Sequence, residues 1–449
     1  MEVTLEQMLQ AREVRAHRQM TLIQKYNRPI VSFCMNIPGP IKDSPLIRRG
    51  FFAGCEALEN SLPPETILYR QIFPAVTGCE AIYVVNMAAT ALKTHTVQIE
   101  DTHPLGRLFD MDVLAPDLSK LDRELVGGGS RNCIVCGASG RGCASRRTHS
   151  VSQLQAAVNS MLTIHFQQED ARKIGELAVQ SLLDEVYTTP KPGLVDRNNS
   201  GSHRDMNLST FESSAHALKP YFCRCAAIGM QMQQASAEDT FALLRKAGLQ
   251  AEQTMFQVTN GVNTHKGAIF TIGLLCAAAG RLWSPEGRWE EDALFRQVSA
   301  MTAEAMEADW QRTGSTTGQK LYKQYGIRGI RGEAAQGLPS VSKLGLPTFR
   351  DYQNRGLDRN MAGVMTLLSL IAQVEDTNMI ARGGLDGAAE GAHQAALLLK
   401  SPTLSDILEL DCWFIQKNLS PGGCADLLAA VYFVDSLLMN QRNDPTGTP

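Results

Sequence analysis

The pattern of apolar residues changes near residue 168, and this change limits the fold more than any single motif. Before it, short runs rich in β-branched and aromatic residues alternate with helical patterns. After it, apolar residues recur every three or four positions and period-two runs are nearly absent. A chain of 449 residues is too long for one ordinary core. We therefore predict two domains, residues 1–168 and 169–449, that meet in the polar segment 167–170.

The first domain combines both kinds of element. The patterns predict helices over residues 1–27 and 41–58, an amphipathic run over 151–166, and strands over 29–36, 81–87, 96–100 and 108–114. A strong turn signal, Ile37-Pro38-Gly39-Pro40, follows the first strand. We expect an α/β or α+β domain with a mixed sheet, whose strand order the sequence does not define.

The second domain is predicted to be all-α. Its helices are expected over residues 174–187, 213–230, 241–254, 268–281, 292–308, 360–372, 387–399 and 424–438.

Asp110 and Asp112 are the sharpest chemical signal in the first domain. Alternate residues of a strand project to the same face, so the two carboxylates would lie together. Such a pair suits Mg²⁺, which binds a few carboxylates together with substrate phosphates. The alternative is a solvent-facing strand edge of alternating polarity.

Basic and amide side chains in the same domain suit phosphate binding. Asn36 and Lys42 flank the rigid turn, and Arg107 lies close to the aspartate pair in sequence. Scattered basic residues are also common on ordinary surfaces.

A cysteine-rich segment over residues 127–149 contains a candidate zinc site. Cys133, Cys136, Cys143 and His149 could form a Cys₃His set. Free thiols in a loop, or a redox-sensitive pair, are the alternatives.

Polar, glycine-bearing segments of the second domain precede or interrupt its apolar helices. The most concentrated is 185–206, and others lie at 261–267, 331–334, 375–384 and 418–423. Helix N-termini offer free N–H groups and partial positive charge, so they attract phosphate. We propose from this pattern a polyphosphate site with the following ligands: Lys191, Arg197, Asn263, Lys266 and Arg382. Ordinary helix capping and a solvated surface loop are the alternatives.

The first domain resembles the citrate lyase holo-acyl-carrier-protein synthase family. The resemblance rests on PIVSFCMNIPGPIKDSPLIRRGF, HPLGRLFDMDVLAP, RNCIVCG and RRTHSVSQL, and covers nearly all of residues 10–165. It implies transfer of a phosphoribosyl-dephospho-CoA group from a triphosphate donor to a serine of the citrate lyase acyl carrier protein (gamma subunit), with release of diphosphate. Asp110 and Asp112 match the family's expected metal site.

The second domain resembles triphosphoribosyl-dephospho-CoA synthase over residues 170–438. The matching segments are TPKPGLVDRNNSGSHRDM, GVNTHKGAIFTIGLL, RGEAAQGLP, EDTNMIARGG and NLSPGGCADLL. The resemblance implies that the 2′-hydroxyl of dephospho-CoA attacks C1 of the ATP ribose and expels adenine. A related synthase serves malonate decarboxylase, and the first domain favours citrate lyase.

Glycosyl transfer develops positive charge on the ribose, so it requires a nearby carboxylate and a base for the incoming hydroxyl. Our candidates for catalysis are Asp196, Asp205, Glu333, Asp376 and His203, with Mg²⁺ shared by Asp205 or Asp376. Two alternatives of another kind are an ATP-binding module without turnover and a nucleosidase-like hydrolase.

The net charge of −3 gives no general attraction to nucleic acid or anionic membranes. The charged N-terminus lacks a signal-peptide core. The 11 cysteines do not form a regular framework and are expected to be mostly reduced. We expect a cytoplasmic protein that binds neither nucleic acid nor membrane.

Overall fold

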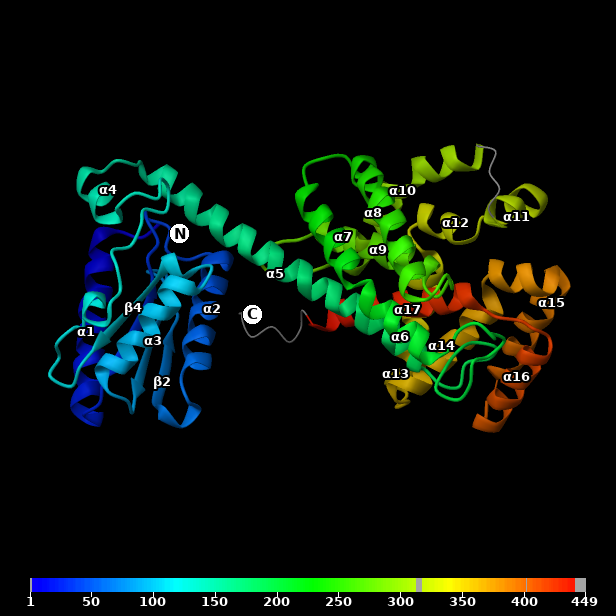
Figure 1. Ribbon diagram of the computed structural model, residues 1–449, viewed down its shortest axis with the longest axis horizontal. Helices are drawn as coiled ribbons and strands as arrows, with labels where there is room; N and C mark the ends of the chain where they lie inside the picture. The colour runs from blue at the N-terminus through cyan, green and yellow to red at the C-terminus, as the bar shows by residue number, and fades with distance from the viewer. Residues whose placement is uncertain (1, 312–316, 401, 441–449) are drawn as a thin grey trace. The chain divides into compact units, whose positions relative to one another are not determined.

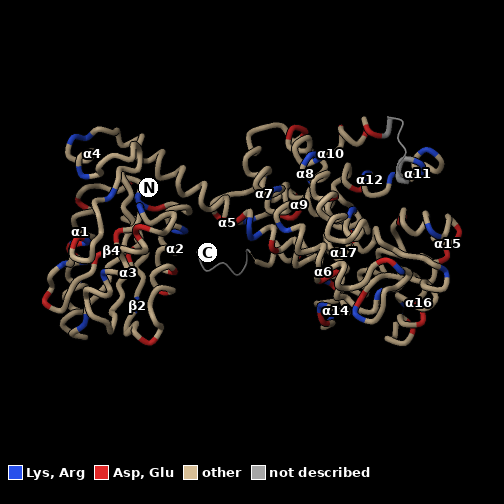
Figure 2. The backbone as a smooth tube through the Cα atoms, viewed as in Figure 1, with Lys and Arg blue, Asp and Glu red and all other residues tan. Residues whose placement is uncertain are grey.

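The computed structural model describes residues 2–311, 317–400 and 402–440 of the chain (Figure 1). These residues divide into two compact units, one ending at Phe166 and the other beginning at Gln167. Figure 2 shows basic and acidic positions interspersed along the backbone.

The first unit is built on a four-stranded antiparallel sheet in the order β2-β3-β1-β4. Its elements are α1 (Leu5–Tyr26), β1 (Ile30–Met35), α2 (Pro45–Ser61), β2 (Ile67–Phe73), β3 (Glu80–Val85), α3 (Ala89–Thr102), β4 (Phe109–Leu114) and α4 (Gly140–Arg146), with 3-10 turns at Pro64–Thr66, Gly106–Leu108 and Arg123–Val126. Helix α2 joins β1 to β2, and helix α3 joins β3 to β4. In each case one other strand lies between the two that are joined, which is the ferredoxin-like, split βαβ topology.

Two predictions for this unit are wrong. The sheet is not mixed, because every pairing among the described strands is antiparallel. The helical connections do produce parallel strands, but these are not neighbours. Residues 96–100 form no strand; they lie in α3, where the buried residues Leu92, Thr96 and Ile99 recur at helical spacing. The pattern also gives no sign of β2, which is an edge strand with several exposed positions.

The two faces of the sheet are covered by different helices. On one face, Phe33 stacks on Phe51 of α2 with ring centroids 5.0 Å apart. On the other, Leu22 and Ile23 of α1 pack against β1 and β3. Since Asp110 and Asp112 pair in register with Cys34 and Ser32 of β1, both carboxylates lie on the α1 side.

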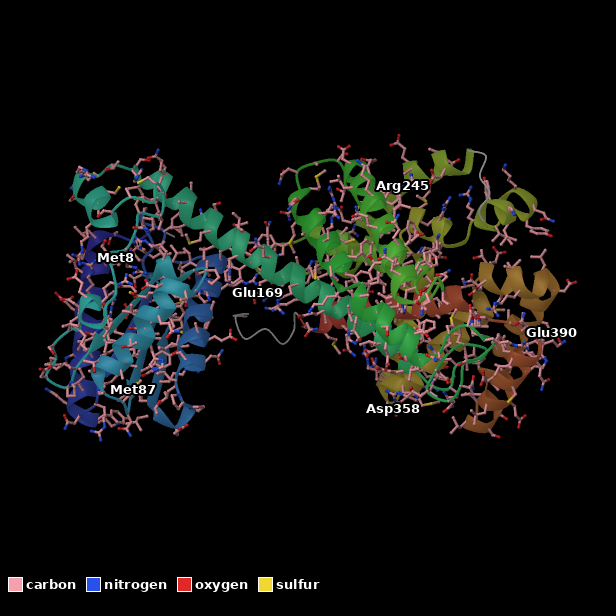
Figure 3. All side chains as sticks on the ribbon, in the orientation of Figure 1. Met8, Met87, Glu169, Arg245, Asp358 and Glu390 are labelled. Atoms are coloured by element: carbon pink, nitrogen blue, oxygen red, sulfur yellow. The ribbon has the colours of Figure 1, made fainter. Side chains whose placement is uncertain are left out.

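Helix α5 (Val151–Tyr187) contributes residues to both units. The amphipathic run 151–166 and the helix expected over 174–187 are parts of one 37-residue helix that continues through the polar residues between them. Glu169, labelled in Figure 3, forms an ion pair of 2.7 Å with Lys173 one turn later. Pairs at this spacing support a helix where apolar residues are sparse.

The described part of the second unit contains only helices, as predicted. They are the second part of α5, then α6 (Leu208–Ala217), α7 (Lys219–Gln231), α8 (Ala237–Val258), α9 (Lys266–Arg281), α10 (Glu291–Gln311), α11 (Thr317–Tyr325), α12 (Gly329–Ala335), a π-helical turn (Ser340–Gly345), α13 (Leu346–Asn354), α14 (Arg359–Gln373), α15 (Thr377–Leu398), α16 (Leu404–Gln416) and α17 (Gly422–Asn440). The single helix expected over 213–230 is two, because Pro220 lacks the N–H that a continuous helix would use.

Helices α7 and α9 approach closely enough for their backbones to touch. A Cβ added to Gly229 of α7 would lie 2.1 Å from the carbonyl oxygen of Ala277 of α9. A Cβ added to Gly280 of α9 would lie 2.1 Å from the carbonyl oxygen of Ala226 of α7. The two glycines therefore fix α9 against α7 near its C-terminal end.

Helix α17 runs through the core of the second unit. It is long and apolar enough to cross a membrane by length and composition, but 72% of its most apolar window is buried inside the protein. Its apolar character is accounted for by this burial.

Candidate functional site

Four segments of the second unit that are far apart in the sequence line one cleft of about 470 Å³. They are the loop between α5 and α6 and the starts of α9, α15 and α17. Six of the residues proposed from the sequence line this cleft: Lys191, His203, Asp205, Asn263, Lys266 and Arg382. Asp196, Arg197, Glu333 and Asp376 do not.

The loop between α5 and α6 is held in shape by two buried carboxylates. Asp196 accepts hydrogen bonds from the backbone N–H groups of Lys191, Asn198 and Asn199. Asp411 of α16 accepts from the backbone of Gly193 at 2.9 Å and from Asn199 Nδ2 at 2.8 Å. Asp196 therefore organises the loop that carries the cleft residues.

Lys191 is buried, and its ammonium group is already paired. It donates to the carbonyl oxygen of Glu185 at 2.8 Å and to the Glu185 carboxylate. Burial raises the pKa of Glu185, and the neighbouring Lys191 charge opposes that rise. The pair adds little net charge to the cleft.

His203 connects Arg382 to the start of α17. Its Nδ1 lies 3.1 Å from Arg382 Nη2, and its Nε2 lies 2.8 Å from Ser420 Oγ. A guanidinium group has only donors, so Nδ1 must be the acceptor and Nε2 carries the hydrogen. Burial, and then the Arg382 charge, lower the pKa of His203. The neutral imidazole therefore positions Arg382 and Ser420.

The start of α9 presents a mostly neutral histidine and an exposed lysine. The Asn263 side chain accepts from the Lys266 backbone N–H at 3.2 Å, and Lys266 Nζ lies 2.8 Å from Glu252 Oε2. Burial, with a smaller effect of the Lys191 charge, lowers the pKa of His265 to about 3. Its Nδ1 lies 2.8 Å from Ser214 Oγ, whereas its Nε2 is buried without a hydrogen-bond partner.

Asp426 is the acid in this cleft that the sequence interpretation missed. It belongs to the first turns of α17, lines the cleft and accepts a hydrogen bond from the backbone N–H of Ala268 in α9. Burial, followed by the charges of Glu185 and Asp376, raises the pKa of Asp426 well above its usual value. A Cβ on Gly267 would lie 1.9 Å from Asp426 Oδ2. The available signal was an acid close to the start of a largely apolar helix, in which Asp435 is the other acid.

The other proposed acids have structural partners. Asp376 caps α15: its carboxylate accepts from the backbone N–H groups of Asn378, Met379 and Cys424. Glu333 lies in a neighbouring pocket of about 290 Å³ and accepts from Ser340 at its N–H and hydroxyl.

Two further residues complete the description of the proposed ligands in this unit. Arg197 is exposed and stacks over the Tyr187 ring, 4.7 Å from its centroid. Asp205 is exposed at the cleft, with Oδ1 3.8 Å from His203 Nδ1.

In the first unit, Asp110 and Asp112 share a face of β4, as predicted from their spacing. Asp112 Oδ2 lies 2.6 Å from Lys120 Nζ, and Asp110 Oδ2 lies 3.8 Å from the Cys34 thiol. Burial, and then the Asp112 charge, raise the pKa of Asp110. A cation near these groups would relieve the repulsion between the two carboxylates.

Asn36 and Arg107 line a second cavity of about 620 Å³, together with Cys133, Cys143 and His149. Lys42 does not line it; its ammonium group donates to the carbonyl oxygen of Ile37 and so holds the turn after β1. Arg107 donates to the carbonyl oxygen of Asn132.

The four candidate zinc ligands lie together. The ligand atoms of Cys133, Cys136, Cys143 and His149 are all within 4.8 Å of one another. Hydrogen bonds from the backbone N–H groups of Cys136 and then Val135 lower the pKa of Cys133 to about 6. The structure thus gathers the four residues that the sequence singled out.

Comparison with known proteins assigns each unit to a family. Residues 3–165 match the family described as apo-citrate lyase phosphoribosyl-dephospho-CoA transferase, CitX. Residues 171–445 match the family described as ATP:dephospho-CoA triphosphoribosyl transferase, CitG.

Curated relatives extend over nearly the whole chain. Protein CitXG of Haemophilus influenzae is 35% identical over 96% of each chain, and Protein CitXG of Leuconostoc mesenteroides subsp. cremoris is 31% identical over 97% of each. The 2-(5''-triphosphoribosyl)-3'-dephosphocoenzyme-A synthase of Haemophilus ducreyi is 36% identical over 68% of this chain and 99% of that protein. The chain therefore belongs to the CitXG family and is a bifunctional transferase of citrate lyase prosthetic-group synthesis.

Proposed function

We propose that the second unit transfers the triphosphoribosyl group of ATP to 3′-dephospho-CoA. The 2′-hydroxyl oxygen of dephospho-CoA bonds to C1 of the ATP ribose, and the C1–N9 bond to adenine breaks. The proton of the 2′-hydroxyl is transferred, by way of a base in the cleft, to the departing adenine. The triphosphate remains on the ribose. The product is 2′-(5″-triphosphoribosyl)-3′-dephospho-CoA. The observation that carries this proposal is the convergence of three helix N-termini, two cationic side chains and the half-buried acid Asp426 on one cleft.

The cationic side of the cleft suits the triphosphate. Helices α9 and α17 have 16 and 19 residues, and both begin at the cleft, where the partial positive charge of a helix N-terminus favours an anion. Protein side chains already accept from the N–H groups of Lys266, Ala268 and Cys424, so the helix dipole is the main contribution of these termini. Lys266 adds a point charge beside its partner Glu252. Arg382 adds a second positive charge, which is fixed in place because its Nη1 donates to Ser202 and Asn418 and its Nη2 donates to His203. Lys191 contributes less charge because Glu185 neutralises it.

Asp426 is the base we assign to the incoming hydroxyl. Burial raises the pKa of Asp426 well above its usual value, so this carboxylate in the cleft takes up a proton more readily than an ordinary aspartate, as a general base must. It also places negative charge near a ribose that becomes positive. Asp196, Asp376 and Glu333 are engaged in holding the backbone, so we assign them positioning roles.

Two more cleft residues have defined tasks in this proposal. Thr264 Oγ1 donates to Ser214 Oγ, which leaves the Ser214 hydrogen for His265 Nδ1. His265 Nε2 then carries a hydrogen that an acceptor on the nucleotide can receive. Asp205 is the free carboxylate for Mg²⁺, whose charge would offset that of the triphosphate.

We propose that the first unit attaches the product to a serine of the citrate lyase acyl carrier protein, its gamma subunit. The serine oxygen bonds to the phosphorus nearest the ribose, the bond to the terminal diphosphate breaks, and the serine proton is released. Asp110 and Asp112 would hold Mg²⁺ at this step, and Asn36 and Arg107 would contact the phosphates from their cavity. Lys42 would shape the turn beside them. Because the substrates are ATP and dephospho-CoA and the cysteines are free thiols, we place the protein in the cytoplasm.

The test follows free adenine and the mass of the apo-carrier protein. The full chain with ATP and dephospho-CoA should release adenine and add the prosthetic group to the carrier. Adenine release without dephospho-CoA would indicate a hydrolase, and nucleotide binding without adenine would indicate a binding module. Modification of the malonate decarboxylase carrier protein in preference to that of citrate lyase would show that malonate decarboxylase is the target of the transfer.

A further inference from the structure

We propose that Cys133, Cys136, Cys143 and His149 bind one Zn²⁺ ion, which holds the segment 129–150 in place beside the cavity of the first unit. The proposal rests on the arrangement of the four side chains, on the turn that carries the first two, and on the lack of other buried side chains in the segment.

The spacing of the ligand atoms suits a tetrahedral ion. Zn–S bonds of about 2.3 Å and Zn–N bonds of about 2.0–2.1 Å require neighbouring ligand atoms to be about 3.6–3.8 Å apart. Cys136 Sγ lies 3.5 Å from Cys143 Sγ and 3.3 Å from His149 Nε2. Small movements of the side chains would therefore complete the site.

The turn at Cys133–Cys136 is built as a knuckle around a thiolate. The backbone N–H of Gly137 donates to the carbonyl oxygen of Cys133 at 3.0 Å, and Gly137 has a φ of 73°, which favours glycine. This turn directs the N–H groups of Val135 and Cys136 toward Cys133 Sγ. Such donors stabilise a sulfur that carries negative charge, as a metal-bound thiolate does.

Few apolar contacts hold the segment, although Arg131 and Asn132 near its start form hydrogen bonds to the rest of the first unit. Between residues 129 and 150, Cys133 and Cys143 are the two buried side chains, and both are proposed ligands. Helix α4 has only seven residues and buries Cys143 alone. A segment without an apolar core of its own commonly depends on a metal or a disulfide for its structure.

The ligand set selects the metal. Three thiolates and an imidazole favour zinc over Mg²⁺ or Ca²⁺, which prefer oxygen ligands. Four protein ligands fill the tetrahedron, so the ion would be structural and leave no position for substrate. Since Cys133, Cys143 and His149 also line the cavity with Asn36 and Arg107, the ion would stabilise one wall of that cavity.

The experiment measures zinc bound to the full-length protein. The chain is purified with reductant, supplied with one equivalent of Zn²⁺, dialysed against a weak chelator and analysed by inductively coupled plasma mass spectrometry. We expect about one zinc per chain, as one Cys₃His set provides. Cys136→Ser and His149→Ala should reduce zinc to the background level. Cys412→Ser, which changes an exposed thiol of α16, is the matched control and should retain zinc.

A second measurement does not depend on variants that fold. Co²⁺ added to the wild-type chain should give the absorption of tetrahedral cobalt with thiolate ligands, and Zn²⁺ should abolish it. Wild-type protein that retains no zinc, variants that retain as much as wild type, or a Cys136–Cys143 disulfide in the reduced preparation would each overturn the proposal.

The effect of the ion on the cavity rests on the proposed function and is tested separately. Removing zinc should slow modification of the carrier protein and leave adenine release unchanged. If zinc is bound but its removal does not slow modification of the carrier protein, the zinc site is confirmed. The proposed role of the neighbouring cavity in carrier modification is then wrong.

Discussion

Replacing Asp426 by Asn tests the assignment of the base most directly. Asn has nearly the same shape, and its Oδ1 can still accept from the Ala268 N–H that Asp426 binds. The substitution removes the ability to take a proton and leaves Lys266 and Arg382 in the cleft. We therefore expect turnover to fall while the ATP concentration needed for half-maximal rate changes little.

The expected loss is large, and the fold should tolerate it. Removing a general base typically slows a reaction by about 10²–10⁴-fold, which corresponds to about 2.7–5.4 kcal/mol of transition-state free energy. Because the folded protein raises the pKa of Asp426, the ionised carboxylate disfavours folding. That cost is absent below the pKa of an unfolded aspartate and grows as pH rises toward the folded pKa. At neutral pH the Asn variant should be at least as stable as wild type.

The assay is adenine release from ATP at saturating dephospho-CoA, followed across pH. Wild-type turnover should fall as pH decreases through the raised pKa of Asp426, above the range of an ordinary aspartate, and the Asn variant should lack this limb. Asp386→Asn, at an exposed position of α15, is the matched control. Turnover of Asp426→Asn close to that of wild type would refute the assignment.

A second substitution reaches the same carboxylate without changing its charge. Gly267→Ala introduces a Cβ 1.9 Å from Asp426 Oδ2, so the carboxylate must move, and adenine release should fall with it. Gly248→Ala, whose Cβ has only an ordinary contact of 3.7 Å with Tyr221, is the control and should retain activity.

Three more outcomes test other parts of the protein. Arg382→Gln should raise the ATP concentration for half-maximal rate by about tenfold or more, since one charged hydrogen bond contributes about 1.5–3 kcal/mol; an unchanged value would remove Arg382 from the triphosphate site. Asp112→Asn should abolish modification of the carrier protein, measured by mass spectrometry, and preserve adenine release, measured by chromatography. Asp411→Ala leaves the donors of Gly193 and Asn199 unpaired, so chemical denaturation should show a loss of about 1–3 kcal/mol; unaltered stability would contradict its structural role.

The sequence predicted most of the long elements because their apolar residues recur at a clear period. It could not show the strand order of the first unit, because the pairing of β1 with both β3 and β4 depends on contacts across the whole sheet. The strand predicted at 96–100 is wrong because Thr96 and Ile99 are of types enriched in strands, whereas here α3 buries both on one helical face.

The sequence indicated which segments line the candidate cleft, but it did not indicate the role of each side chain in them. Lys191 and Lys266 both line it, and each has a carboxylate partner, Glu185 and Glu252. The Lys191–Glu185 pair is buried, whereas the Lys266 side chain is exposed. Asp376 and Asp426 are both acids near helix starts. The backbone donors that occupy Asp376 come from α15 and α17, and the surroundings that raise the pKa of Asp426 depend on the packing of α9 against α17. Such partners depend on the folded chain.

The contact between α7 and α9 lies outside the candidate cleft, yet it fixes a helix that contributes residues to that cleft. Gly229 and Gly280 allow the C-terminal end of α9 to pack closely against α7. The N-terminal end of α9 carries Lys266 and the Ala268 N–H that donates to Asp426. A methyl group at either glycine would force α7 and α9 apart, and the displacement of α9 would move the residues that it contributes to the cleft. Substitutions intended to change substrate preference should therefore leave Gly229 and Gly280 unchanged.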